Sequence, residues 1–169
     1  RFAQLLRINN KSFINTMKSF KGLPHRFEIF LEKRNTIFIN DSKATSFKAT
    51  DLALSSLKNI YWILGGLPKK KDKLELSKFK DNIVKCYIIG RNIEFFKKQI
   101  KGKLNFKVTK NLNNSITQII RDIKLKKNNY KNKSILLSPA AASFDQFLNF
   151  EKRGDEFKRI CKKYAGKFI

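Results

Sequence analysis

Short apolar segments recur along the chain and are separated by stretches in which the apolar residues follow a helical spacing. Several of these segments lack a regular polar alternation, which is typical of parallel strands covered on both faces. The predicted strands cover residues 27–30, 36–39, 60–64, 84–89, 104–108 and 134–137. The clearest helical stripe is formed by Leu112, Ile116, Ile119, Ile120 and Ile123.

Weaker helical patterns lie between most of the other predicted strands. They cover residues 49–57, 76–83, 93–100 and 157–164. Residues 1 to about 20 predict a helical tail, in which Phe13, Met17 and Phe20 recur at helical spacing. Repeated alternation of strand and helix predicts an α/β sandwich with a mostly parallel sheet. The first two strands, 27–32 and 36–40, are separated by only a few polar residues, so we expect a hairpin that supplies one antiparallel edge strand.

A boundary lies near the start of the chain, where Gly22 and Pro24 interrupt the helical pattern. We therefore separate residues 1–21 from a domain at residues 22–169. The chain starts at Arg1 without an initiator Met and shows no signal peptide, so we expect it to be part of a longer protein. Because no apolar run approaches the ~20 residues that a spanning helix needs, we expect no transmembrane segment.

The charge of the chain is strongly unbalanced. Its 169 residues include 38 Lys and Arg against 13 Asp and Glu, which gives a net charge of +25. Such a surplus attracts phosphates, nucleic acid or anionic membranes. However, 30 of the 38 basic residues are Lys, whereas readers of bases and phosphates rely on Arg. A basic nucleic-acid-binding module stays an alternative, but we expect neither a specific nucleic acid nor a membrane as partner.

The chain is poor in metal-binding residues. Its two cysteines, Cys86 and Cys161, are 75 positions apart, and His25 is its one histidine. This spacing fits neither a zinc ribbon nor a redox pair. We expect both thiols to be buried packing residues, and we expect no metal site formed by this chain.

Polar residues and glycines follow four of the predicted strands. These loops begin at Asn40, Gly65, Gly90 and Ser138 and supply hydroxyls, lysines and free backbone N–H groups. Because ligands of open α/β sheets bind beyond the carboxyl ends of the strands, we expect a receptor for carboxylate or phosphate at this edge. Taken singly, each feature is better explained as an N-cap or a tight turn, but four coincident loops favour a site. The chain has no G-x-x-x-x-G-K-[ST] motif, so it lacks a standard nucleotide-phosphate loop.

Four motifs at these positions are more specific. They are Gly22-Leu-Pro-His-Arg-Phe-Glu28, Asn40-Asp-Ser-Lys-Ala-Thr45, Gly65-Gly66 with Lys69, and Leu137-Ser-Pro-Ala-Ala-Ala-Ser-Phe-Asp-Gln-Phe147 followed by Asn149-Phe-Glu-Lys-Arg-Gly154. In this order they closely resemble the carboxy-terminal domain of the Mur ligase family, and among its members those that add D-glutamate. The resemblance covers about residues 22–154 and implies a Rossmann-like three-layer sandwich. The Asp-Asn-Pro-Arg signature of members that select diaminopimelate is missing, which favours a small dicarboxylate acceptor.

The activity that this resemblance implies is ATP-dependent, ADP-forming amide synthesis in the cytoplasm. D-glutamate is added to UDP-N-acetylmuramoyl-L-alanine through an acyl phosphate in peptidoglycan synthesis. Residues 1–21 would be the tail of the preceding ATP-binding domain and the hinge, and residues 22–169 the amino-acid-binding domain. The amino-terminal domain and most of the central domain, which mainly binds ATP and Mg²⁺, would be absent, so we expect the chain alone to be inactive. Another Mur-type ligase or a folylpolyglutamate ligase is the alternative within this class.

The resemblance also assigns roles in binding D-glutamate. Lys69 and Thr45 match the residues that grip one carboxylate, by charge and by hydroxyl. Lys70 and Lys71 follow Lys69 directly, which leaves open which of the three ammonium groups reaches the substrate.

The other carboxylate is assigned to the last motif. Ser143, with the backbone around Phe144 and Phe150, matches its grip, and we expect the Phe150 ring to lie in the core. Many family members carry Cys where Ala141 stands and Asn where Ser46 stands, and both replacements are small enough to preserve the geometry.

The remaining matched positions face the nucleotide. Arg26 resembles a nucleotide contact from the interdomain hinge, and Asp41 a contact to the ATP ribose or its surroundings. Lys43 resembles a catalytic cation near the phosphates. For His25, a nucleotide contact and a packing role with one hydrogen bond are both open.

Overall fold

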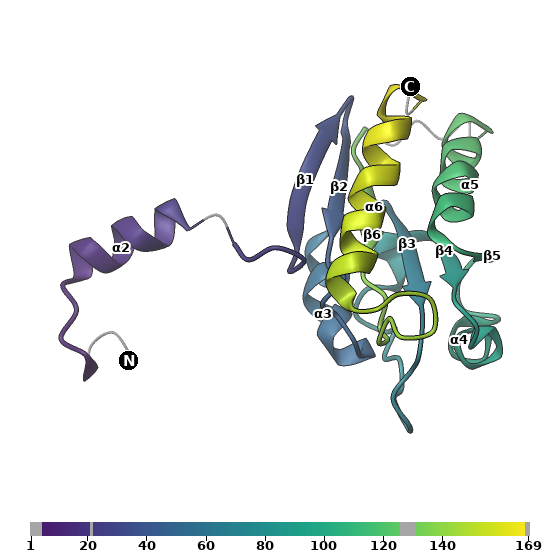
Figure 1. The fold of residues 1–169 in the computed structure, drawn as a ribbon, viewed down its shortest axis with the longest axis horizontal. Helices are drawn as coiled ribbons and strands as arrows, with labels where there is room; N and C mark the ends of the chain where they lie inside the picture. Colours follow the sequence, from purple (N-terminus) through teal and green to yellow (C-terminus); the bar gives the residue numbers. More distant parts are fainter. Residues whose placement is uncertain (1–4, 21, 126–130, 168–169) are drawn as a thin grey trace.

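The computed structural model describes residues 5–20, 22–125 and 131–167, and it shows a six-stranded sheet with helices on both faces (Figure 1). Residues 1–4 and 21 of the predicted tail lie outside the described residues. The strands are β1 (Glu28–Lys33), β2 (Thr36–Asn40), β3 (Ile60–Gly65), β4 (Ile83–Ile89), β5 (Phe106–Lys110) and β6 (Lys133–Leu137). The helices are α2 (Asn10–Ser19), α3 (Phe47–Ser56), α4 (Ile93–Ile100), α5 (Leu112–Leu125) and α6 (Phe150–Tyr164), with two 3₁₀ turns, η1 (Lys80–Asn82) and η2 (Ala165–Lys167).

The strands follow the order β1-β2-β6-β3-β4-β5, and only the β1–β2 pair is antiparallel among the described strands. Leu136 of β6 pairs with Ile39 of β2 on one side and with Trp62 of β3 on the other, which aligns the three central strands. The predicted Rossmann-like sandwich, with a mostly parallel sheet and one antiparallel edge strand, is thereby confirmed.

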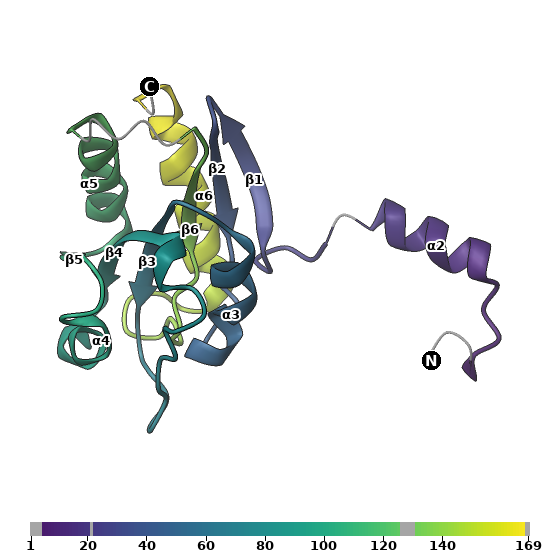
Figure 2. The ribbon, with the colours of Figure 1, turned by 180° about the vertical axis from the view of Figure 1, so that it is seen from behind.

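The two faces of the sheet carry separate cores, because successive side chains of a strand point to opposite faces. Trp62 of β3 packs in the core that contains α3 and α4, whereas the neighbouring Tyr61 packs in the core that contains α5 and α6. Figure 1 shows α5 and α6 in front of the sheet, and Figure 2 shows α3 from the opposite side. Cys86 and Cys161 are buried in the two cores, as expected.

The prediction of a helix at residues 76–83 is wrong. The apolar residues of this segment are buried as the pattern requires, but only Lys80–Asn82 forms a 3₁₀ turn, and Ile83 already belongs to β4. The side-chain amide of Asn82 donates to the carbonyl of Leu54 at 2.9 Å. This contact ties the connection to α3, so packing overrides the local helical spacing here.

The α2 helix lies apart from the sandwich in both views (Figure 1 and Figure 2). None of its residues is buried, and Phe13, Ile14 and Met17 are 43%, 49% and 58% exposed. The predicted helical tail is therefore present, with an apolar side that the sandwich does not cover. Among the helices of the described ranges, none has the length and apolar character needed to cross a membrane.

Candidate functional site

The loops that follow β2, β3 and β6 meet at the carboxyl edge of the sheet, which is the lower edge in Figure 1. The Gly65 N–H donates to the Pro139 carbonyl at 2.9 Å. Leu67 and Ala142 exchange two backbone hydrogen bonds of 2.8 and 3.0 Å. The structure thus brings together loops that lie far apart in the sequence, as the sequence predicts.

The loops that carry Thr45 and Lys69 are joined through Asp72. The Asp72 carboxylate accepts the backbone N–H of Phe47, the first residue of α3, at 2.9 Å. Thr45 is half-buried and directly precedes Ser46, which caps α3. Lys69 is exposed on a loop that extends beyond β3 (Figure 1). A carboxylate between these two side chains would also lie near the positive amino-terminal end of α3.

Ser143 lies on the loop after β6 and is buried, with 2% of its surface exposed. Its carbonyl accepts the N–H groups of Gln146 and Phe147 at 3.0 and 2.9 Å, which closes a tight turn. Its hydroxyl makes no hydrogen bond to the described residues. Phe144, beside it, is 70% exposed at the rim of this edge.

Asp41 lies at the end of β2 and is held by two donors. The Ser138 hydroxyl donates to Oδ2 at 2.7 Å, and the backbone N–H of Phe27 donates to Oδ1 at 3.1 Å. Burial raises the pKa of the Asp41 carboxyl, although both hydrogen bonds and the charge of Arg26 act in the opposite direction. Each carboxylate oxygen keeps a lone pair for a further donor, such as a ligand hydroxyl.

Three of the four residues assigned to the nucleotide line one cavity of about 300 Å³. Its walls are Arg26, Phe27, Asp41, Lys43, Ala44, Ala49 and Leu52. Two cations and one carboxylate therefore face the cavity together with an apolar wall from α3. This combination fits a ligand that is anionic at one end and apolar at the other.

The ring of Phe150 connects Lys43 with His25. Lys43 Nζ lies 3.8 Å from the ring centroid, in a cation–π contact, and the His25 ring meets Phe150 edge to face at 5.8 Å. The expectation that this ring lies in the core is wrong, because Phe150 is half-buried and belongs to neither core cluster. The reason is the cap: Asn149 accepts the N–H of Lys152 and starts α6 at the level of the loops.

His25 is buried and does not line the cavity of Lys43. Its Nδ1 lies 2.9 Å from the amide nitrogen of Asn40, which also donates to Glu28 Oε2 at 2.9 Å. With this amide as the donor, Nδ1 accepts and the ring proton lies on Nε2, 3.8 Å from Asp155. The geometry favours the packing role of His25 over a nucleotide contact.

Two buried polar residues at this edge, Ser42 and Arg153, escape prediction from the sequence. The Ser42 hydroxyl donates to the Phe150 carbonyl at 2.8 Å and accepts Arg153 Nε–H at 3.0 Å. The signal for Arg153 is its position, since it falls on the helical stripe of Phe157 and Ile160, where an apolar residue is expected. A cation on that stripe indicates buried acceptors, but not which ones.

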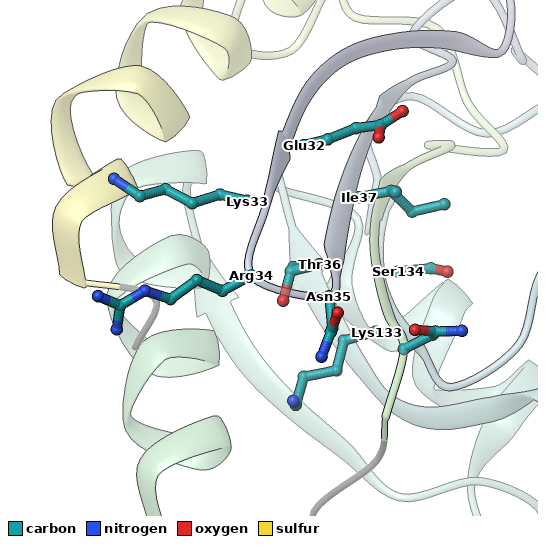
Figure 3. A pocket seen from close by; sticks show the side chains of 9 residues that line it. Glu32, Lys33, Arg34, Asn35, Thr36, Ile37, Lys133 and Ser134 are labelled. Atoms are coloured by element: carbon teal, nitrogen blue, oxygen red, sulfur yellow. The ribbon is translucent and has the colours of Figure 1, made fainter.

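A second cavity, of about 480 Å³, lies at the opposite edge of the sheet beside the β1–β2 hairpin. Figure 3 shows that Lys33 and Arg34 point away from Glu32 there, so these charges do not converge on one ligand. Over the described ranges, no group of three or more His, Cys, Asp or Glu side chains is placed to hold a metal ion. The carboxyl edge is therefore the better candidate site.

Known proteins are similar to this chain in sequence over most of its length. No family model matches the chain. However, it is 39% identical over 166 residues to the UDP-N-acetylmuramoylalanine–D-glutamate ligase of Wolbachia sp. subsp. Brugia malayi, across 98% of this chain and 32% of the relative. Proteins with the same name from Nitrobacter hamburgensis and Rickettsia felis are 39% and 34% identical to it, across 89% and 96% of this chain and 32% and 36% of their own length. The chain thus spans about a third of the length of these relatives and is similar to them over that third.

Proposed function

We propose that this chain is the carboxy-terminal, amino-acid-binding domain of an ATP-dependent, ADP-forming ligase that joins D-glutamate to UDP-N-acetylmuramoyl-L-alanine in peptidoglycan synthesis. The observation that carries the proposal is the hydrogen-bonded junction of the loops of Thr45, Lys69 and Ser143 at one edge of the sheet. The relatives named above support it, because their printed names give this activity.

In this proposal, D-glutamate lies between the three loops. The Lys69 ammonium and the Thr45 hydroxyl bind one carboxylate, and the Ser143 hydroxyl, with the backbone at Phe144 and Phe150, binds the other. Charge-assisted bonds of this kind are about twice as strong as neutral ones. Fixing both ends of a five-carbon ligand directs its amine at the activated acyl carbon, and such positioning lowers the barrier of a bimolecular step by several kcal/mol.

The nucleotide is assigned to the adjoining cavity. Arg26 and Lys43 present cations suited to phosphate, and the Asp41 carboxylate presents an acceptor suited to a ribose hydroxyl. The Phe150 ring supports the proposal for Lys43, because it fixes the ammonium 3.8 Å above its centroid. His25 acts behind this ring as a packing residue.

Among the described residues, no group of three or more His, Cys, Asp or Glu side chains is placed to hold a metal ion. We therefore assign Mg²⁺ and most of the phosphate contacts to another part of the ligase. This chain's own contribution is to hold the amino acid and one side of the nucleotide.

We further propose that the exposed apolar side of α2 packs against the ATP-binding domain of the same ligase. Phe13, Ile14 and Met17 are each more than 40% exposed on one helix, which is unfavourable in water. In this arrangement residues 1–21 are the connection to that domain, and the ligase works in the cytoplasm.

The direct test is ADP release by the full-length ligase. We expect release to require ATP, UDP-N-acetylmuramoyl-L-alanine and D-glutamate together, and L-glutamate or diaminopimelate to support it poorly. The 169-residue chain alone should release no ADP. ADP release that does not depend on D-glutamate would contradict the proposal. If the protein also bound nucleic acid more tightly than micromolar, in a salt-sensitive way, it would favour the nucleic-acid-binding module instead.

A further inference from the structure

The buried side chain of Arg153, on α6, forms hydrogen bonds with two loops of the candidate site. It is 1% exposed. Its Nε donates to the Ser42 hydroxyl at 3.0 Å, and its Nη2 donates to the carbonyls of Ser42 and Ala141 at 2.8 and 3.0 Å. One side chain of α6 therefore fixes the loop after β2 to the loop after β6.

The third loop packs against the remaining nitrogen. Nη1 of Arg153 lies 3.2 Å from the position that a Cβ on Gly66 would take, so the guanidinium abuts the backbone of the loop after β3. Gly66 also has a φ of +136°, which a residue with a side chain adopts only with strain. Nη1 has no hydrogen-bond partner among the described residues, although it is fully buried.

The charge of Arg153 is not neutralised within the described part of the chain. No described carboxylate lies within ion-pair distance of it, and Asp145 acts on it only at longer range. Burial lowers the pKa of Arg153 to about 10, so the guanidinium still carries its charge at neutral pH. A buried cation without a paired anion is costly for stability and makes the electrostatic potential of the surrounding loops more positive.

We infer that Arg153 is a positioning residue for the acidic amino acid. It acts through Ser42 and Ala141, which precede Thr45 by three residues and Ser143 by two on the same loops, and its unpaired charge favours a doubly negative ligand there. This inference rests on the proposed function, and it adds a residue that touches neither the amino acid nor the nucleotide. A merely structural clamp would affect both substrates alike or neither.

The test compares Arg153→Lys and Arg153→Met in the full-length ligase, with Arg159→Lys as the control on the same helix. Arg159 is exposed and pairs with Glu156 at 2.7 Å, so its replacement should leave the KM for D-glutamate and the KM for ATP unchanged. We expect Arg153→Lys to raise the KM for D-glutamate roughly tenfold, since Lys cannot reproduce the planar fork. Arg153→Met should raise it further, while the KM for ATP stays within about twofold in both variants.

A second variant guards against loss of folding. Ser42→Ala removes one acceptor of Arg153 and should raise the KM for D-glutamate about threefold, with kcat and the KM for ATP preserved. An unchanged KM for D-glutamate in all three variants, or equal increases for D-glutamate and ATP, would overturn the inference alone. A wild-type ligase whose ADP release does not depend on D-glutamate would overturn the proposed function and this inference with it.

Discussion

The two edges of the sheet are both rich in polar residues, but they are organised differently. At the carboxyl edge, backbone and side-chain bonds run between loops, as from Ser138 to Asp41 and from Arg153 to Ser42. At the amino edge, the cavity beside the β1–β2 hairpin is larger, about 480 Å³ against about 300 Å³. There Lys33 and Arg34 project to one side and Glu32 to the other (Figure 3).

This difference shows that neither cavity size nor charge identifies a site in this molecule. In a chain with a net charge of +25, the presence of cations alone does not distinguish one part of the surface from another. What distinguishes the carboxyl edge is that a buried carboxylate, Asp41, and a buried guanidinium, Arg153, are held there by hydrogen bonds, which preorganises the loops for a ligand. Substitutions at the carboxyl edge should therefore change substrate binding more than substitutions at the amino edge.

The largest effect is expected for Lys69→Ala in the full-length ligase. Removing the partner of a carboxylate should raise the KM for D-glutamate roughly 30-fold, with a much smaller effect on the KM for ATP. Steady-state kinetics with each substrate varied in turn provide the measurement. Lys70→Ala and Lys71→Ala are the matched controls, and a larger effect in either would move the role to that residue.

A smaller effect is expected for Ser143→Ala. The hydroxyl makes no hydrogen bond to the described residues, so its loss should leave the thermal midpoint within about 2 °C while it raises the KM for D-glutamate about sevenfold. Thermal denaturation and kinetics on the same preparation separate the two effects. A large loss of stability with an unchanged KM would make Ser143 a structural hydroxyl.

Most of the fold could be predicted from the sequence because the sheet is covered on both faces. Buried runs such as Ile60–Gly65 carry a strand signal that does not depend on their neighbours. The edge at which the loops meet also follows from the sequence, since the carboxyl ends of parallel strands lie together. The prediction for residues 76–83 fails because its apolar residues are buried in the core that contains α3 and α4, although the segment does not form an α-helix.

The interior of the site could not be predicted in the same way. The bond from Arg153 to Ser42 joins residues 111 positions apart, and no local pattern reports a contact at that separation. The same holds for the ring of Phe150, whose place beside Lys43 depends on where the Asn149 cap starts α6. The spacing of residues along the chain predicts which face of a helix or strand a side chain lies on. It does not predict the hydrogen-bond partners of that side chain, because these are contributed by loops that are far away in the sequence.

The next prediction concerns the pH dependence of stability, for which β1 offers two carboxylates, Glu28 and Glu32. Burial alone would raise the pKa of Glu28, but bonds from the His25 N–H, Lys158 and Asn40 lower it below 4.5. A carboxyl with a lowered folded pKa adds stability above its unfolded pKa and loses it as the pH falls through the folded value. Glu28→Gln should therefore lower the thermal midpoint of the chain at pH 7 by about 2 °C and flatten its decline below about pH 4.5.

The matched control for this measurement is Glu32→Gln. Glu32 is exposed at the other end of β1, and its carboxylate accepts no hydrogen bond from the described residues. Its variant should show the wild-type midpoint at pH 7 and the wild-type acid decline. An equal change in both variants would mean that the network around Glu28 adds nothing beyond the loss of a surface charge.

The smallest effect is expected at the amino edge. The double variant Lys33→Ala with Arg34→Ala removes two cations that line the 480 Å³ cavity and carry no ion pair to the described residues. Because they lie at the opposite edge from the loops, the KM values for D-glutamate and ATP should stay within about twofold of the wild type in 150 mM salt, where long-range attraction is screened. A selective rise in the KM for D-glutamate would show that diffuse charge, rather than the joined loops, determines amino-acid binding.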